Sequence, residues 1–106
     1  MVSPRFLDKS LFDHLAEKAA GNPRGRQHHN LHQMQESCHR MVVGLQPSTY
    51  VPPHRHLSSE KAETLLVLRG ALGVLIFDEG GQVLDKRVLQ AGGDSLGVDL
   101  PPGVFH

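Results

Sequence analysis

The sequence predicts an all-β fold, a small barrel or sandwich, with one short helix ahead of it. From Arg40 onward, short apolar segments alternate with turns rich in Gly, Pro and Asp. Short strands at regular spacing are typical of β-sandwiches and barrels. The segments LLVL and GVLIF are apolar at every position, which predicts strands that are covered on both faces. The 106 residues fit one domain, since domains most often contain roughly 100–150 residues.

A short amphipathic helix is predicted for residues 10–20. Ser10, with Asp13 three residues later, resembles a capping box at the helix start. Gly21 follows the segment and suits a left-handed C-cap. Leu15 belongs to an apolar stripe at helical spacing, so the helix is expected to pack on the outside of the β domain.

Residues 22–37 are polar and predict an extended arm or loop that closes with a strand at residues 30–32. After this arm the alternation of apolar and turn residues predicts a series of strands. The expected strands are residues 40–45, 49–51, 54–56, 63–69, 72–77, 83–89 and 95–100.

Composition excludes several classes of function. Lys plus Arg and Asp plus Glu both number 11, so a net charge of zero gives no electrostatic case for nucleic-acid binding. Cys38 is the single cysteine and has no intrachain partner, which fits a reducing cytoplasm. The longest apolar run, residues 71–77, is far shorter than the ~20 residues that span a bilayer, and no secretion leader is apparent. We expect a soluble, cytoplasmic protein that binds neither nucleic acid nor membrane.

Histidine is abundant, with eight residues of which seven lie in the first 56 positions. It is the commonest metal ligand in proteins. In the segment His54-Arg55-His56, both imidazoles would project from one face of a strand, because strand residues i and i+2 point the same way. One metal ion could therefore take both rings, although such a pair alone is weak evidence.

Two further features strengthen the metal hypothesis. Glu63 opens the next strand and supplies a carboxylate across from the two imidazoles. The turn Pro101-Pro102-Gly103 could direct His106 back toward the same place. Two histidines with one carboxylate suit Fe(II), Mn(II), Ni(II) or Zn(II).

These residues match two motifs of the cupin family. The first reads HRH, then Glu63, then six residues and Gly70; the second is PPGVFH, which fits the pattern P-x-G-x-x-H. The wider context, RQHHNLH, CHRMVVGLQPSTYVPPHRH and ETLLVLRGALGVLIFDEGG, resembles the WbuC-type cupin-fold metalloproteins of the RmlC-like cupin superfamily. The resemblance runs from Arg26 to His106.

The resemblance implies a cupin jelly-roll β-barrel over residues 26–106, preceded by a helix and arm over residues 1–25. It implies that a divalent Zn, Ni, Mn or Fe ion lies in the barrel mouth, with ligands His54, His56, Glu63 and His106. It also implies a link to bacterial surface-polysaccharide (O-antigen) biosynthesis. A homodimer is expected by analogy with the pairing of cupins through their sheets.

The chain departs from the family pattern in three places. Six residues separate His56 from Glu63, where cupins usually have three or four, so Glu60 is a rival ligand at the shorter spacing. Glu63 is preferred because its distance to Gly70 fits the motif. Ser95 replaces a glycine of the second motif. A cupin would continue through one or two strands after His106, so those strands are expected to be absent here or to come from another subunit.

Other residues are candidates for contacts around the metal. Asn30 and His32 occupy the N-x-H position that the resemblance marks, with Arg26 just upstream, so the arm would contact the metal ligands or the substrate. Tyr50 has the same strand parity as the two histidines of the HRH segment and is a candidate pocket residue. The alternative for the arm is a solvated loop.

Two main functions are compatible with these features. The first is a metal-dependent enzyme acting on a sugar or nucleotide-sugar by isomerisation, epimerisation or lyase chemistry, with the metal as Lewis acid and His32 as the catalytic proton carrier. The second is a non-catalytic module in which the metal stabilises a small barrel that binds a sugar or anion. A weaker third possibility is an iron-dependent dioxygenase.

Overall fold

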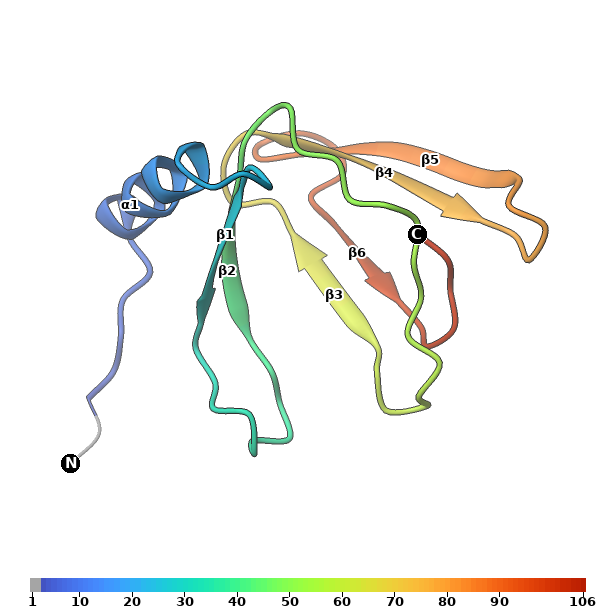
Figure 1. Ribbon diagram of the computed structural model, residues 1–106, viewed down its shortest axis with the longest axis horizontal. Coiled ribbons are helices and arrows are strands. Elements are labelled where there is room, and N and C mark those ends of the chain that lie inside the picture. The colour runs from blue at the N-terminus through green and yellow to red at the C-terminus, as the bar shows by residue number, and fades with distance from the viewer. Residues whose placement is uncertain (1–2) are drawn as a thin grey trace. The chain divides into compact units, whose positions relative to one another are not determined.

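The computed structural model describes residues 3–106 as two compact units, the first ending at Val51 and the second spanning Pro52–His106. Figure 1 shows one helix, α1, and strands β1 to β6 along the chain. The described strands pair into two-stranded antiparallel sheets, β1 with β2, β3 with β6 and β4 with β5. The predicted β-rich fold with one short helix is thus confirmed. The unit boundary lies between Val51 and Pro52, whereas the predicted boundary between the helix with its arm and the barrel lies after residue 25.

Helix α1 spans Lys9–Ala20 and begins slightly earlier than predicted. Asp8, not Ser10, is its N-cap, because Asp8 has extended backbone geometry and its Oδ1 accepts the Leu11 N–H at 3.0 Å. The predicted left-handed C-cap is wrong, since Gly21 has φ −86° and continues the right-handed turn. A Cβ at this position would lie 3.8 Å from the Lys18 carbonyl oxygen, an ordinary contact, so a residue with a side chain would also fit here.

The first unit is built from α1 and the hairpin of β1 (Arg26–Asn30) and β2 (Met41–Leu45). The helix contacts both strands, and Leu15 on its inner face is buried. A Cβ placed on Gly44 of β2 would lie 2.7 Å from the Leu15 carbonyl oxygen, so only glycine allows this close approach. The strand predicted at residues 30–32 lies instead at Arg26–Asn30.

The second unit contains β3 (Glu63–Leu66), β4 (Ala71–Phe77), β5 (Val83–Gln90) and β6 (Gly97–Leu100). Its strands follow the predicted apolar segments, although the segment predicted at residues 63–69 is a shorter strand. The predictions of regular strands at residues 49–51 and 54–56 are wrong. The prolines at positions 52 and 53 provide a reason, since proline has no N–H to donate to a ladder.

Backbone hydrogen bonds extend the two strand pairs of the second unit beyond the named strands. The Val67 N–H donates to the Leu96 carbonyl at 2.9 Å, and the Ala91 N–H donates to the Gly70 carbonyl at 3.1 Å. Phe77, at the end of β4, pairs with Phe105 near the end of the chain. The closing segment is therefore tied to β4.

The prediction that LLVL and GVLIF are covered on both faces is wrong for this chain. Burial alternates along β3, and Leu66 is 67% exposed. It alternates similarly through most of β4, where Leu75 is exposed. Two-stranded sheets have only one face turned to the core here, so the second set of apolar side chains meets solvent. No helix among residues 3–106 is long and apolar enough to cross a membrane.

Candidate metal centre

The HRH segment and the end of the chain run side by side, held by backbone hydrogen bonds. The His54 N–H donates to the His106 carbonyl at 2.9 Å, and the His106 N–H donates to the His54 carbonyl at 3.0 Å. This double exchange is the pattern of a hydrogen-bonded pair in an antiparallel ladder. The Gly103 N–H also donates to the His56 carbonyl at 2.7 Å. The HRH segment is thus extended and paired, although it lies outside the named strands.

Gly103 makes this pairing possible. Its φ of 85° lies in the left-handed region, which side chains with a Cβ disfavour. The Pro101-Pro102-Gly103 turn therefore reverses the chain after β6 and places His106 beside His54. This is the return that the P-x-G-x-x-H pattern predicted.

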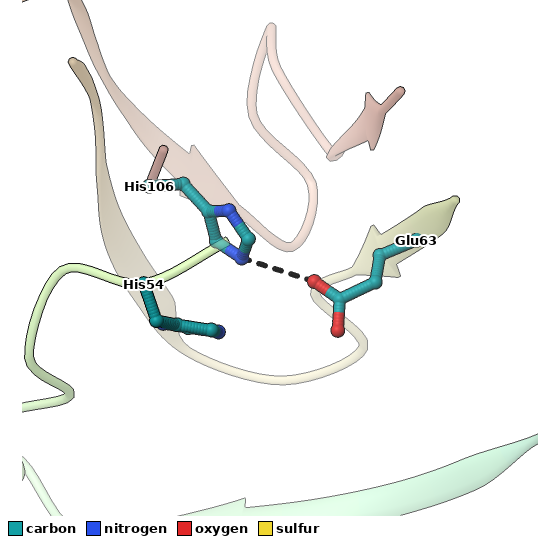
Figure 2. Close-up of side chains that lie close together, drawn as sticks. All are labelled: His54, Glu63 and His106. Carbon is teal, nitrogen blue, oxygen red and sulfur yellow. Dashed lines mark ion pairs between the residues drawn. The ribbon is translucent and has the colours of Figure 1, made fainter. Parts of the chain in front are cut away.

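Glu63, the first residue of β3, lies between two of the histidines. Its Oε1 is 3.1 Å from His56 Nε2, and its Oε2 is 3.0 Å from His106 Nε2. Figure 2 shows the His106–Glu63 contact with the His54 ring beside it. One ligand atom each from His54, Glu63 and His106 all lie within 4.8 Å of one another, so this cluster could hold a metal ion.

The second nitrogen of two rings is occupied by the backbone. His54 Nδ1 lies 3.1 Å from the Pro52 carbonyl oxygen, and His106 Nδ1 lies 3.0 Å from the Val104 carbonyl oxygen. A carbonyl oxygen only accepts hydrogen bonds, so each Nδ1 carries the proton and donates it. In the neutral rings, both Nε2 atoms therefore present lone pairs. This is the tautomer in which a histidine binds metal through Nε2.

The tautomers make the His106–Glu63 contact informative. In neutral His106, the Nε2 lone pair would face a carboxylate oxygen at 3.0 Å, and two acceptors at that distance repel. A cation between them, either a proton on Nε2 or a metal ion, removes this repulsion. The His106 side chain is only 10% exposed, so water screens the pair poorly.

The fourth predicted ligand, His56, is at the more open side of the cluster. Its ring centroid is 5.5 Å from that of His54, with the planes nearly perpendicular, and its side chain is 42% exposed. The same-face geometry expected for residues i and i+2 thus brings the two rings close together. Direct ligation of a metal by all four residues stays a prediction.

The rival carboxylate, Glu60, does not belong to the cluster that could hold a metal. It is exposed, and its own N–H donates to Ser58 Oγ at 3.3 Å within the loop after His56. Glu63 contacts two histidines because it starts the strand that β6 pairs with, opposite Leu100. The geometry therefore favours Glu63 as the carboxylate ligand.

Arg55, the middle residue of the HRH segment, was not among the predicted site residues. Its Nη1 lies 2.8 and 2.9 Å from the two carboxylate oxygens of Glu79, and its guanidinium lies 4.2 Å from the Phe105 ring centroid. Its side chain therefore links the HRH segment to the turn after β4 and to the residue before His106. The alternation of strand side chains, which directs Arg55 away from the rings of its neighbours, is the signal that could have found it.

Replacing Arg55 with lysine should weaken divalent-metal binding by about tenfold, since residues that orient metal ligands typically contribute 10- to 100-fold. Lysine keeps the charge but loses the planar group that pairs with a carboxylate while stacking on an aromatic ring. The dissociation constant for Zn²⁺, measured by competition with a chromophoric chelator, checks this. Lys61→Ala removes an exposed cation from the loop between His56 and Glu63 and should leave the Zn²⁺ affinity unchanged. An unchanged Zn²⁺ affinity in Arg55→Lys would contradict a role of Arg55 in orienting the ligands.

The remaining candidates, Arg26, Asn30, His32 and Tyr50, all lie in the first unit. Arg26 and Asn30 are the first and last residues of β1, and Tyr50 is 73% exposed. His32 is buried at 8% exposure. Their roles around the metal stay predictions.

The surroundings of His32 explain its burial. The Arg40 N–H donates to His32 Nδ1 at 2.9 Å, and the Arg40 carbonyl oxygen is 2.8 Å from the same nitrogen. The ring of His39 stacks on it, with centroids 4.1 Å apart and planes 6° from parallel. Nδ1 accepts from the Arg40 N–H in one neutral tautomer and donates to the Arg40 carbonyl in the other, so the backbone of Arg40 anchors the ring in either tautomer.

Comparison with known proteins identifies a domain family. The model of a family described as Domain of unknown function (DUF6016) matches residues 7–89, a span that includes His54, His56 and Glu63. No curated protein and no solved structure matches the chain. Function therefore has to be argued from the site.

Proposed function

Since the chain belongs to the family described as Domain of unknown function (DUF6016), we propose from its site geometry that it is a divalent-metal protein with a cupin jelly-roll barrel. The proposed ligands are His54, His56, Glu63 and His106. The proposed activity is that of a metal-dependent enzyme on a sugar or nucleotide-sugar, in the cytoplasm and as a homodimer.

The observation that carries the metal proposal is that hydrogen-bond acceptors, the histidine Nε2 atoms and the Glu63 carboxylate oxygens, lie close together in the cluster. Backbone carbonyls hold the Nδ1 protons of His54 and His106, which leaves the lone pair of each Nε2 free to bind a metal ion beside Glu63. Nitrogen and carboxylate donors in this combination suit Zn, Ni, Mn or Fe as divalent ions. A metal ion would satisfy both rings and the carboxylate at once.

The chemistry follows from the ligand count. Three imidazoles and one carboxylate leave one or two positions open on a six-coordinate ion, which when bound would polarise a carbonyl or hydroxyl of the substrate. Glu63 would be occupied as a metal ligand, so another group must carry the proton that is transferred to or from the substrate. We assign this step to His32, which the resemblance to the WbuC-type cupins marks and whose Nδ1 the backbone of Arg40 anchors. The sugar substrate rests on the resemblance to the WbuC-type cupins.

A second function is a non-catalytic binding module in which the metal stabilises the fold. The small core favours it, because Leu89 and Leu100 are the buried apolar side chains of the second unit among residues 3–106. Because this buried apolar area is small, it contributes only modestly to the free energy of unfolding, and metal ligation would add to it. His32 distinguishes the two functions.

Replacing His32 with alanine should lower turnover about 100-fold or more at unchanged metal content, since general acid–base groups typically contribute 10²–10⁴-fold. The assay follows a panel of nucleotide-sugars by NMR with the Zn-, Ni-, Mn- or Fe-loaded protein. His14→Ala, at an exposed helix position, is the matched control. Turnover that survives His32→Ala would remove His32 from catalysis, and sugar binding without turnover would favour the binding module.

A further inference from the structure

A small pocket lies in the second unit, between the β4–β5 hairpin and β6. Its volume is about 170 Å³. At roughly 30 Å³ for each water-sized group, that space holds a molecule of about six heavy atoms. Its wall combines apolar residues with three charged residues of β5, Asp85, Lys86 and Arg87. The apolar residues used below are Val74, Ile76, Leu89 and Val98.

The sheet register explains why charges share this wall with apolar groups. Arg87 is opposite Val74 and Asp85 is opposite Ile76 in the antiparallel ladder. Residues directly opposite each other project to the same face. The side chains of Asp85 and Arg87 therefore project on the face that carries Val74 and Ile76, whereas Lys86, opposite Leu75, projects on the other face. Leu89, two residues further on the same face of β5, is 1% exposed and forms the floor.

The Arg87 side chain is unpaired in the part of the chain that the structure describes. Among residues 3–106, its guanidinium makes no hydrogen bond or ion pair, whereas Arg55 and Arg40 bind carboxylates. A guanidinium has five donors in a planar fork that matches a carboxylate. An unpaired fork beside an apolar floor is the combination that binds an anionic group attached to a hydrocarbon chain.

Asp85 limits the charge of that ligand. Its Oδ1 accepts the Lys86 N–H at 2.8 Å, so the carboxylate stays at the pocket wall. It is two strand residues from Arg87, a spacing of about 7 Å along the backbone. A second negative charge on the ligand would be repelled at that distance, which disfavours phosphate dianions.

We propose that this pocket binds a short-chain monocarboxylate, with its carboxylate on Arg87 and its hydrocarbon part on Val74, Ile76, Leu89 and Val98. The site goes beyond the proposed metal function and stands on the pocket alone. Val98 is opposite Leu65, which is two residues after Glu63 on the same face of β3, so the pocket and the metal cluster share one side of that sheet.

The test titrates the full chain, stripped of metal with a chelator, with isovalerate, and follows methyl signals by ¹H–¹³C NMR. The methyls of Val74, Leu89 and Val98 should shift, with a dissociation constant of about 1 mM as expected for so small a ligand. The uncharged alcohol 3-methylbutan-1-ol, with the same carbon skeleton, should bind at least about tenfold more weakly. Inorganic phosphate should not compete.

Two variants at exposed positions test the effects of Arg87 and Asp85 on isovalerate binding one at a time. Arg87→Gln should weaken isovalerate binding about tenfold or more, because a hydrogen bond to a charged group is lost. Asp85→Asn should leave it unchanged or strengthen it, because a repulsion is removed. Equal affinity in wild type and Arg87→Gln, competition by phosphate, or no methyl shift in the wild type would each overturn the proposal. A repeat with the Zn-loaded chain keeps this result separate from the metal proposal, since the site should survive in metal-free protein.

Discussion

Replacing Glu63 with glutamine should weaken divalent-metal binding by about 100-fold or more. The carboxylate contacts Nε2 of both His56 and His106, so it is the group that would offset the charge of a bound metal ion. Glutamine keeps the size of the side chain but removes its charge and one of its two acceptor oxygens. The loss should exceed the 10- to 100-fold typical of residues that only orient ligands. Competition with a chromophoric chelator for Zn²⁺ measures it.

Glu60→Gln is the matched control for this prediction. It removes the same charge three positions earlier, in a loop where the carboxylate is exposed and does not belong to the cluster. Its effect on Zn²⁺ affinity should stay within about twofold, the size of a screened surface charge. If Glu60→Gln weakened binding more than Glu63→Gln, the carboxylate ligand would be Glu60, and β3 would not carry the site.

Saturating the metal-free chain with Zn²⁺ should raise the midpoint of thermal unfolding by roughly 15 °C or more. A ligand at 1,000 times its dissociation constant adds about 4 kcal/mol if it binds only the folded state. One kcal/mol moves the midpoint by about 4–8 °C in a small domain. The small buried core of the second unit makes it sensitive to such a contribution. Differential scanning calorimetry with and without Zn²⁺ checks this.

His106→Ala should abolish most of that stabilisation. The His106 side chain is nearly buried and supplies one of the Nε2 atoms of the cluster. His14→Ala serves as control, because it removes a histidine from the exposed side of α1. A Zn²⁺-dependent rise that persisted in His106→Ala and disappeared in His14→Ala would place the stabilising metal in the first unit instead.

Most strands were predictable from the sequence because apolar segments and turn residues are local signals. The segment over β4 ends at Phe77, where the Asp78-Glu79-Gly80-Gly81 turn begins, and Gly81 has the left-handed φ that such a turn needs. The hairpin of β4 and β5 was therefore visible in the residues themselves. The helix was also visible, although its N-cap is Asp8 and not the predicted Ser10.

Whether each face of a sheet is buried against another part of the chain was not predictable in the same way. An apolar residue such as Leu66 or Leu75 indicates that a face is suited to burial, but not what covers it. In this chain those side chains are exposed. Non-local pairing was equally hidden, since β3 pairs with β6 across 30 intervening residues of the chain.

The candidate site was largely visible in the sequence because its residues follow short motifs. The spacing of His54 and His56 indicated a shared face, and Gly103 indicated the turn that returns His106. The choice between Glu60 and Glu63 needed the start of β3, which no local signal fixes. The fixation of the Nδ1 atoms by the backbone at positions 52 and 104 also needed the structure.

The metal content of the chain, purified without a histidine tag and dialysed, tests the central claim most directly. Elemental analysis by mass spectrometry should find about one Zn, Ni, Mn or Fe ion per chain. A triple variant, His54→Ala, Glu63→Gln and His106→Ala, should retain less than about a tenth of that amount while remaining folded by circular dichroism. Equal metal content in the wild type and the triple variant would contradict the account, because the metal would then be held by histidines outside this cluster.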